Sequence, residues 1–323
     1  MFAVYADRFS ADDPVSALQI GERPAPVAPV GWSTVTVRAA GLNHHDLWAL
    51  RGAALHASRV PMILGCDAAG TDEDGNDVIV HAVISDPDWV GDETMDPGRT
   101  LLSEFHQGTF ADQVVVPRRN LVPKPASLSF EEAACLPTAY LTAYRMLFVR
   151  GGLHPGDTVL VQGAGGGVAT ALIILARAGG LRVLATSRDA AKRRRALEIG
   201  AHEVYETGTR LPSRVDAVME TVGKATWSHS VRSLRPGGVL VTSGTTSGAD
   251  LTDAELNKIF FLQLSVIGST MGNRDDLSSL VSFLDATGVR PLVDRVLPMT
   301  EARAGFQAMY NGELFGKVVL TRQ

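Results

Sequence analysis

Four glycines at positions 163 and 165–167 separate a short apolar segment from a long one, and this feature constrains the fold most. Residues 158–162 are predicted to form a buried β-strand and the apolar stretch through Ala178 an α-helix. A loop almost without side chains lets backbone N–H groups and the positive helix end approach a pyrophosphate. The alternative, a glycine-rich turn in an α/β core, is disfavoured by the order strand, loop, helix and next strand. The residues expected to contact a dinucleotide are Gly163, Ala164, Gly165, Gly166, Gly167 and Val168.

The residues after the predicted second strand, 182–186, determine whether NAD(H) or NADP(H) is bound. An NAD site places Asp or Glu about 20 residues past the glycine loop to bind the ribose hydroxyls, whereas Ser187 stands here. Arg188 and Lys192 lie one helical turn apart, so both can donate to a 2′-phosphate. NADP(H) is therefore the predicted cofactor. NAD(H) is the alternative, because Asp189 lies only one residue beyond the position expected for the acidic residue that binds the ribose.

Short apolar runs alternate with helical stretches beyond the glycine loop. The runs at 217–220, 239–243 and 265–268 are typical of βαβ units and a parallel sheet. A possible N-cap at Ser127 or Ser129 opens a long helical pattern through Leu147, where this unit is predicted to begin. The fold class is therefore α/β, with a doubly wound parallel sheet in residues 129–270.

The first 120 residues contain strand-like pieces between Pro, Gly and Asp clusters, at 32–40, 78–84 and 111–116. After Gly272 the pattern predicts helices at 275–286 and 301–311 and a last strand at 317–321. This tail is too short to stand alone. The predicted β-rich domain therefore combines residues 1–128 with 271–323.

Composition excludes several classes of protein. Lys and Arg number 30 against 35 Asp and Glu, a formal net charge of −5, which argues against binding nucleic acid or an anionic membrane. Two cysteines are too few for a disulfide framework. No export signal is visible, and the longest apolar run, 168–176, is about half of the roughly 18 residues that cross a bilayer. A cytoplasmic protein with a small-molecule substrate is expected.

Several motifs in this order resemble the medium-chain dehydrogenase/reductase superfamily, in particular its quinone-oxidoreductase-like and acryloyl-CoA-reductase-like members. The motifs span residues 40–48, 61–70, 108–117, 158–169, 267–272 and 315–320. The resemblance covers nearly the whole chain. It implies a GroES-like β-rich catalytic domain, a Rossmann cofactor-binding domain, and substrate in the cleft.

Zinc-dependent members of the superfamily hold a catalytic zinc with Cys, His and Cys, and the motifs align Asn43, Cys66 and Thr138 with those positions. Only one soft ligand is left, and neither an amide nor a hydroxyl competes for zinc at neutral pH. No metal site is therefore predicted. The zinc-type alcohol dehydrogenase is kept as an alternative, with a different site built from His44, His45, Cys66, Asp67 and His106.

Without a Lewis acid, hydride addition to a quinone, enone or enoyl thioester is the easiest reaction, because hydrogen bonds can stabilise the oxygen that gains charge. The expectation is an NADPH-dependent reductase of this type, and a catalytically silent NADPH-binding or sensing protein is the other alternative. By family position Asn43 and Asp46 line the cleft, with Asn43 donating to the substrate or holding a local turn. His45 or His106 is the proton donor.

The resemblance also assigns further contacts to the cofactor, and residues 257–271 suggest an apolar edge strand that joins a second copy in a homodimer. The assigned residues are Thr138, Thr142, Thr221, Gly223, Ser243, Gly244, Thr245, Ser269, Thr270, Met271 and Lys317, the last reaching the cofactor phosphate or facing solvent.

Overall fold

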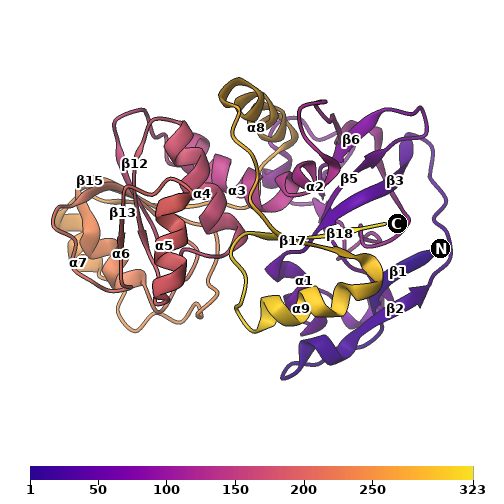
Figure 1. Ribbon diagram of the computed structural model, residues 1–323, viewed down its shortest axis with the longest axis horizontal. Helices are drawn as coiled ribbons and strands as arrows, with labels where there is room; N and C mark the ends of the chain where they lie inside the picture. The colour runs from indigo at the N-terminus through magenta and orange to yellow at the C-terminus, as the bar shows by residue number, and fades with distance from the viewer. Residues whose placement is uncertain (323) are drawn as a thin grey trace. The chain divides into compact units, whose positions relative to one another are not determined.

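The computed structural model describes residues 1–322 and divides the chain into two compact units (Figure 1). One unit contains Met1–Thr138 and the segment that starts at Asn273, and the other is Ala139–Gly272. The sequence pattern placed the first crossing near residue 128. The structure places it ten residues later, because helix α2 (Phe130–Ala133) packs against strands β3 (Trp32–Gly41) and β5 (Asp67–Thr71) of the first unit.

Strand β3 is the centre of the first unit. Its side chains alternate between buried and exposed along most of its length, as expected for a strand that covers a core with one face. On one side it pairs with β5, and on the other with β9 (Gln113–Pro117) and the C-terminal strand β18 (Lys317–Thr321). The tail therefore returns to the unit in which the chain begins. The remaining strands and helices of this unit are β1 (Phe2–Ala6), β2 (Leu18–Glu22), β4 (Met62–Ile63), β6 (Asp77–Val80), β7 (Val83–Ile84), β8 (Thr100–Leu101), β10 (Leu121–Pro123), β17 (Val293–Pro298), α1 (His44–Leu50), α8 (Arg274–Thr287) and α9 (Ala302–Tyr310).

The strand predicted over residues 78–84 is wrong in its middle. Strand β6 ends at Val80 and β7 begins at Val83. The Asn120 amide nitrogen donates to the carbonyls of His81 (2.9 Å) and Val83 (2.7 Å), so a side chain replaces the strand ladder there. A side-chain partner 37 or 39 residues away is not visible in local periodicity.

The second unit is a six-stranded parallel sheet with the order β13-β12-β11-β14-β15-β16. The chain starts in the middle of the sheet, runs to one edge and then returns to build the other half. Since crossovers are right-handed, the helices of the two halves cover opposite faces, which is the doubly wound arrangement. Its elements are α3 (Leu141–Tyr144), β11 (Thr158–Val161), α4 (Gly167–Ala178), β12 (Arg182–Thr186), α5 (Ala190–Glu198), β13 (Glu203–Tyr205), β14 (Val215–Glu220), α6 (Trp227–Ser233), β15 (Leu234–Thr242), α7 (Leu256–Phe261) and β16 (Ser265–Gly268).

The long helix predicted from residue 129 starts as expected but is not continuous. Ser129 caps it, accepting from the Glu132 N–H at 3.2 Å. Residues 136–140 and 145–150 are π-helical instead of α-helical. Pro137 lies in the first of these segments, and a proline has no N–H for the α-helical ladder, so local regularity is lost there.

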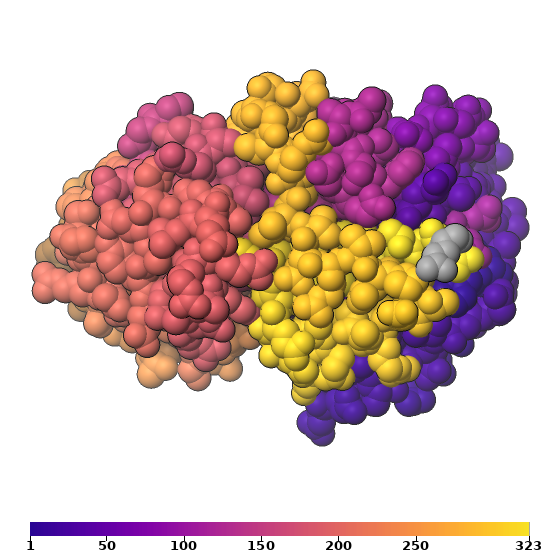
Figure 2. Space-filling view, in the orientation of Figure 1, coloured from indigo at the N-terminus to yellow at the C-terminus, as the bar shows by residue number. Residues whose placement is uncertain are grey.

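Helix α5 lies on the face of the second unit that Figures 1 and 2 show in coral. Ala196 is its only buried residue; Arg194 and Arg195 are exposed, whereas Lys192 and Arg193 are partly buried. Within residues 1–322, no helix combines the length and hydropathy that a membrane crossing needs.

Candidate cofactor and substrate sites

The glycine loop joins β11 to α4, and its backbone needs glycine at two positions. Gly163 and Gly165 have φ of 73° and 135°, values that residues with side chains rarely adopt. Two bonds hold the loop against the end of β12: Ala164 N–H to the Thr186 carbonyl at 2.7 Å, and Gly163 N–H to its hydroxyl at 3.3 Å. Gly166 is the N-cap of α4 and offers no side chain to its first turn. The positive end of α4 is therefore open to an anionic group.

Lys192 lies directly over this loop. A Cβ on Gly165 would come within 2.8 Å of the Lys192 Cδ atom and 3.4 Å of its Nζ atom, whereas a Cβ on Gly166 would meet nothing within 4 Å. The ammonium group therefore lies beside the glycine loop. Space, backbone donors and a positive charge all fit the phosphates of a dinucleotide.

The turn after β12 fixes which residue stands at the ribose position. Ser187 follows the strand directly and Arg188 comes next, exposed. Asp189 is the N-cap of α5, and its carboxylate accepts from the N–H groups of Ala191 (2.7 Å) and Lys192 (3.1 Å). Both N–H groups donate to Oδ1, so the cap fixes the direction of the Asp189 carboxylate at the start of α5.

The carboxyl ends of β14 and β15 carry the second group of expected cofactor contacts. The buried Glu220 carboxylate accepts from the N–H groups of Val222 (2.7 Å) and Gly223 (3.0 Å), which fixes the loop after β14. Gly223 has φ of 88°, and a Cβ there would lie 2.6 Å from the Gly248 carbonyl oxygen. The residues that this edge brings together are Thr221, Gly223, Ser243, Gly244 and Thr245.

The segment after β16 carries Ser269, Thr270 and Met271. Ser269 N–H donates to the Thr242 carbonyl at 2.9 Å, so this residue continues along the same sheet edge. Its hydroxyl is buried and has no hydrogen-bond partner among residues 1–322. Met271 adopts a left-handed φ of 40° next to the crossing between the units.

The two threonines expected near the nicotinamide fall in different units. Thr142 lies in α3 of the second unit and is buried. Thr138 is the last residue of the first stretch of the other unit, and its hydroxyl has no partner within the described part of the chain.

Lys317 does not reach a phosphate and does not face solvent, so both expectations for it are wrong. It is 2 % exposed, and its ammonium donates to the Leu42 carbonyl (2.9 Å), Asn43 Oδ1 (2.6 Å) and Asp67 Oδ2 (3.1 Å). Three donors meet three acceptors, and Asp67 is fully buried. Lys317 and Asp67 form a buried ion pair inside the first unit, and Asn43 is hydrogen-bonded to both. These three residues are the Lys317 cluster.

Of the two roles expected for Asn43, the structure supports the local turn and not a contact with substrate, and Asp46 shares that turn through the capping box of α1. The Asn43 amide nitrogen donates to Asp67 Oδ2 (2.9 Å) and the Gly41 carbonyl (3.3 Å), so both of its hydrogens are used inside the protein. Asp46 is fully buried and accepts from the N–H groups of Asn43 (2.8 Å) and Gly65 (3.0 Å). Burial raises the pKa of Asp46 to about 6. Both residues brace the start of α1.

His45, the third residue predicted to act in catalysis, has a different environment. Its side chain is 17 % exposed, its Nε2 atom lies 2.8 Å from Glu104 Oε1 and its Nδ1 atom 3.5 Å from Cys66 Sγ. Burial alone lowers the pKa of His45, but the neighbouring Cys66, Glu104 and Asp46 outweigh it and leave the pKa well above the usual 6.5. Burial raises the pKa of the Cys66 thiol, which favours its protonated form.

His106 lies elsewhere in the same unit and has a weaker claim as proton donor. Its Nε2 atom is bonded to the Thr100 hydroxyl at 2.9 Å, and its ring packs against that of Trp32. Burial and the charge of Arg59 lower its pKa. His106 is therefore less protonated than His45 at neutral pH.

The residues at the aligned ligand positions do not fit zinc. The Asn43 amide is bonded to an ammonium, and the two ring nitrogens of His45 face different partners, so His45, Cys66 and Glu104 cannot converge on one ion. Among residues 1–322, no three His, Cys, Asp or Glu side chains are grouped to hold a metal. The alternative site from His44, His45, Cys66, Asp67 and His106 is therefore not assembled.

Sequence reasoning missed Glu104 and the buried partner role of Asp67. Glu104 meets His45 across 59 residues and Asp67 meets Lys317 across 250. No local pattern marks either pairing.

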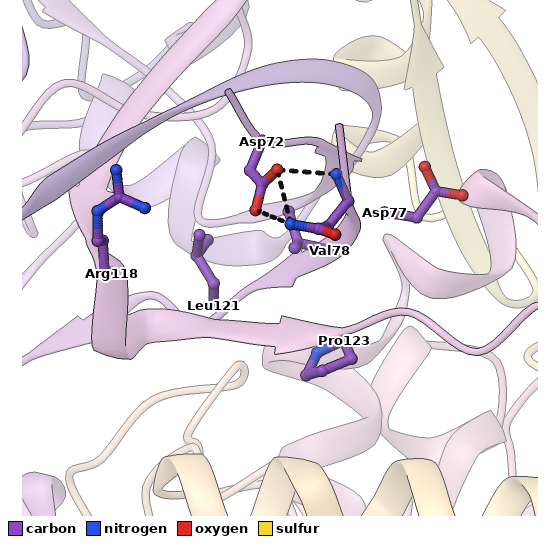
Figure 3. Close-up of a pocket in the computed structure, with 7 residues that line it drawn as sticks. Asp72, Asp77, Val78, Arg118, Leu121 and Pro123 are labelled. Carbon is purple, nitrogen blue, oxygen red and sulfur yellow. Dashed lines mark hydrogen bonds between the residues drawn. The ribbon is translucent and has the colours of Figure 1, made fainter. Parts of the chain in front are cut away.

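Asp72, Asp77, Val78, Arg118, Leu121 and Pro123 line a pocket elsewhere in the first unit (Figure 3). Its polar groups already have partners: Asp72 accepts from the Asn76 backbone and side chain, and Arg118 pairs with Glu73 and Asp74.

Comparisons with known proteins agree with this architecture. Residues 167–286 match the family model described as zinc-binding dehydrogenase, and residues 29–126 match the alcohol dehydrogenase GroES-like domain. A crystal structure of an NAD-dependent alcohol dehydrogenase is 32 % identical, with a TM-score of 0.92 and full coverage of both chains. An alcohol dehydrogenase of Geobacillus stearothermophilus is 28 % identical, covering 94 % of this chain and 96 % of that one. Acryloyl-coenzyme A reductase of Sulfurisphaera tokodaii is 24 % identical, covering 95 % and 97 %.

The chain therefore belongs to the medium-chain dehydrogenase/reductase superfamily, a family of oxidoreductases. The predicted fold class, a GroES-like domain with a Rossmann domain, is confirmed. The acryloyl-coenzyme A reductase relative supports the expected quinone- and enoyl-reductase-like branch.

Proposed function

We propose that this protein is an NADPH-dependent reductase that transfers hydride to a quinone or an α,β-unsaturated carbonyl compound without a metal ion. The observation that carries the proposal is the Lys317 cluster, which binds Asn43, at one of the aligned zinc-ligand positions, into a buried ion pair. The Lys317 ammonium would also repel a divalent cation there. The acryloyl-coenzyme A reductase relative supports an enoyl thioester as one substrate class.

The residues that would hold NADP(H) are those around the glycine loop and at the strand ends of the second unit. Gly166 leaves the N-terminus of α4 open for the pyrophosphate, with Lys192 beside it. Arg188 would donate its planar fork to the 2′-phosphate, whereas the Asp189 carboxylate that NAD(H) would need already caps α5. Thr142, Thr221, Ser243 and Ser269 would contact the nicotinamide half.

When bound, reduced nicotinamide supplies a hydride, that is two electrons, to the β-carbon of the substrate or to the quinone. The substrate then carries one negative charge on its oxygen and needs one proton to complete the reduction. Both ring nitrogens of His45 face acceptors, Glu104 Oε1 and Cys66 Sγ, which favours the form with a proton on each nitrogen, and His45 would deliver one of these protons. Conjugated substrates suit this chain since their charge spreads onto an oxygen that hydrogen bonds can stabilise.

We further propose a cytoplasmic homodimer. Strand β16 is the last strand at one edge of the parallel sheet, and Val266 on it is 42 % exposed. Phe260 and Phe261 of α7 are 60 % and 76 % exposed. An unpaired apolar edge of this kind would join the same edge of a second copy. Both cysteines are free and buried, which is compatible with a reducing compartment.

The test is a substrate panel with both pyridine nucleotides. Quinones, enones and enoyl thioesters are assayed by consumption of NADPH and NADH, and primary and secondary alcohols by formation of NADPH and NADH. We expect turnover with NADPH and a conjugated acceptor. Turnover confined to alcohols would favour the alcohol dehydrogenase function of two of the relatives. Tight NADPH binding with no turnover would favour a sensing protein.

A further inference from the structure

Three side chains from distant parts of the first unit stand in a row. His45 lies in the first turn of α1, Cys66 stands just before β5, and Glu104 belongs to the loop after β8. The imidazole is in the middle, with the Glu104 carboxylate 2.8 Å from Nε2 and the Cys66 sulfur 3.5 Å from Nδ1. This row is separate from the Lys317 cluster, whose donors and acceptors are bonded to one another.

The hydrogen-bond directions in the row follow from the partners of Cys66. Its S–H group donates to the Leu102 carbonyl at 3.3 Å, so toward His45 the sulfur acts as an acceptor. The Glu104 carboxylate is an acceptor at the other ring nitrogen. Both nitrogens of His45 therefore face acceptors, and only the doubly protonated imidazolium donates to both. The neutral ring would leave one of the two contacts without a proton.

The loop that carries Glu104 is fixed by contacts on both sides of this residue. Ser103 is fully buried and adopts a left-handed φ of 69°, and its N–H donates to the His106 carbonyl at 2.8 Å. Arg59 braces the far side, stacking 4.1 Å from the centre of the Phe105 ring and donating to the Phe105 carbonyl at 3.2 Å. A left-handed serine costs free energy and persists only where its surroundings hold it. Ser103 directly precedes Glu104, whose carboxylate contacts His45.

The charged and titratable groups facing His45 are few. Glu104 contacts it from the loop, Cys66 from the approach to β5, and Asp46 from the next position of α1. Asp67, behind Cys66, is paired with Lys317. Glu104 is the only one of the facing groups with a direct carboxylate contact to the ring.

We propose that Glu104 is a positioning residue that holds His45 as the proton donor of the reduction, and this inference rests on the proposed function. After hydride has reached the substrate, the proton on His45 Nδ1 moves to the substrate carbon or oxygen that carries the charge. The electron pair of the N–H bond stays on Nδ1, which then takes a proton from water. Nδ1 is the donating atom because its contact with sulfur is long, while Glu104 keeps the ring oriented through Nε2–H. Cys66 stays a thiol throughout.

The first experiment follows the His45 signals by NMR in protein labelled with ¹³C and ¹⁵N histidine, in the absence of substrate. In the Glu104→Gln variant we expect the pKa of His45 to fall by about one unit or more, because the amide keeps an acceptor but loses the charge. Glu104→Asp should recover part of the shift. The His202 signal, in the other unit, is the internal control and should not move. An unchanged His45 titration in Glu104→Gln would overturn the proposal.

The second experiment measures kcat and KM against pH with NADPH and the best acceptor of the panel. In Glu104→Gln we expect kcat to fall about 10- to 100-fold at pH 8, with KM within about threefold, and the high-pH limb of kcat to move down with the NMR titration. Glu73→Gln, a carboxylate of the same unit that pairs with Arg118, is the matched control and should keep wild-type kinetics. An unchanged kcat in Glu104→Gln would also overturn the proposal. If no acceptor is reduced at all, the proposed function fails, and the NMR titration still decides whether Glu104 holds the charge of His45.

Discussion

Replacing Lys317 with methionine removes the only cation that contacts the buried Asp67 carboxylate among the described residues. Methionine keeps most of the volume and the apolar stem, so the change acts mainly on charge and hydrogen bonds. Lys317 is 2 % exposed and Asp67 is 0 % exposed, and the Asp67 Oδ1 atom has no partner in the part of the chain that the structure describes. After the substitution, the Asn43 amide at 2.9 Å would be the main remaining donor to Oδ2.

Breaking one partner out of a buried ion pair costs about 3–5 kcal/mol, because the other charge stays buried without compensation. Because the Asn43 bond to Asp67 remains, we expect Lys317→Met to lower the free energy of unfolding by about 3 kcal/mol, the lower end of this range. A loss of that size is a large fraction of the roughly 5–15 kcal/mol that stabilises a typical domain. The double variant Lys317→Met/Asp67→Asn should recover most of it, since no uncompensated charge then remains.

The assay is urea unfolding at pH 7.5, followed by tryptophan fluorescence. Trp32, Trp48 and Trp89 report on the first unit and Trp227 on the second, so a Trp227→Phe background isolates the unit that contains Lys317. A loss of less than about 1 kcal/mol for Lys317→Met, or a double variant no more stable than the single one, would show that no buried charge is left uncompensated.

Three further predictions concern the cofactor, acid stability and assembly. Arg188→Ala should weaken NADPH binding about 10- to 100-fold in calorimetry while NADH binding changes less than about twofold; equal losses for both would remove Arg188 from the 2′-phosphate site. Burial, with the charge of Arg274, lowers the pKa of His81 to about 4 from 6.5, and its ring nitrogens have no hydrogen-bond partner within residues 1–322. The unfolded chain therefore binds a proton that the folded chain rejects, and stability is lost as pH falls from 6.5 to 4. The free energy of unfolding in urea is compared at pH 4.5 and pH 7.5. His81→Leu should reduce its fall between these pH values by up to about 3 kcal/mol, and an unchanged fall would contradict the role of His81. Phe261→Arg/Val266→Arg should turn a dimer into a monomer in light scattering, and a wild-type monomer at micromolar concentration would contradict the dimer.

The local parts of the fold and the cofactor loop were predictable from the sequence. Strands β12, β16 and β18 have the predicted bounds, because each is a short apolar or β-branched run between turn residues. The glycine loop and the order of Ser187 and Arg188 after β12 depend on residues close together in the chain. Such features are set by backbone conformation and periodicity, which a sequence displays directly.

The substrate side was less predictable, because its partners come from distant segments. Lys317 follows a glycine at the start of a strand, which gave no sign that its ammonium meets Asp67 across 250 residues. The turn role of Asn43 is visible in the sequence, but its bond to Asp67, 24 residues away, is not. The family resemblance aligned the ligand positions, but it did not show that an ion pair binds Asn43 or that Glu104 joins His45.

The proposed reductase transfers hydride from NADPH and needs no metal ion. The direct measurement is the rate of NADPH oxidation with a conjugated acceptor, in protein dialysed against a strong chelator and checked for metals by elemental analysis. We predict an undiminished rate that added zinc does not increase. A rate that disappears with the metal and returns with stoichiometric zinc would contradict metal-free hydride transfer.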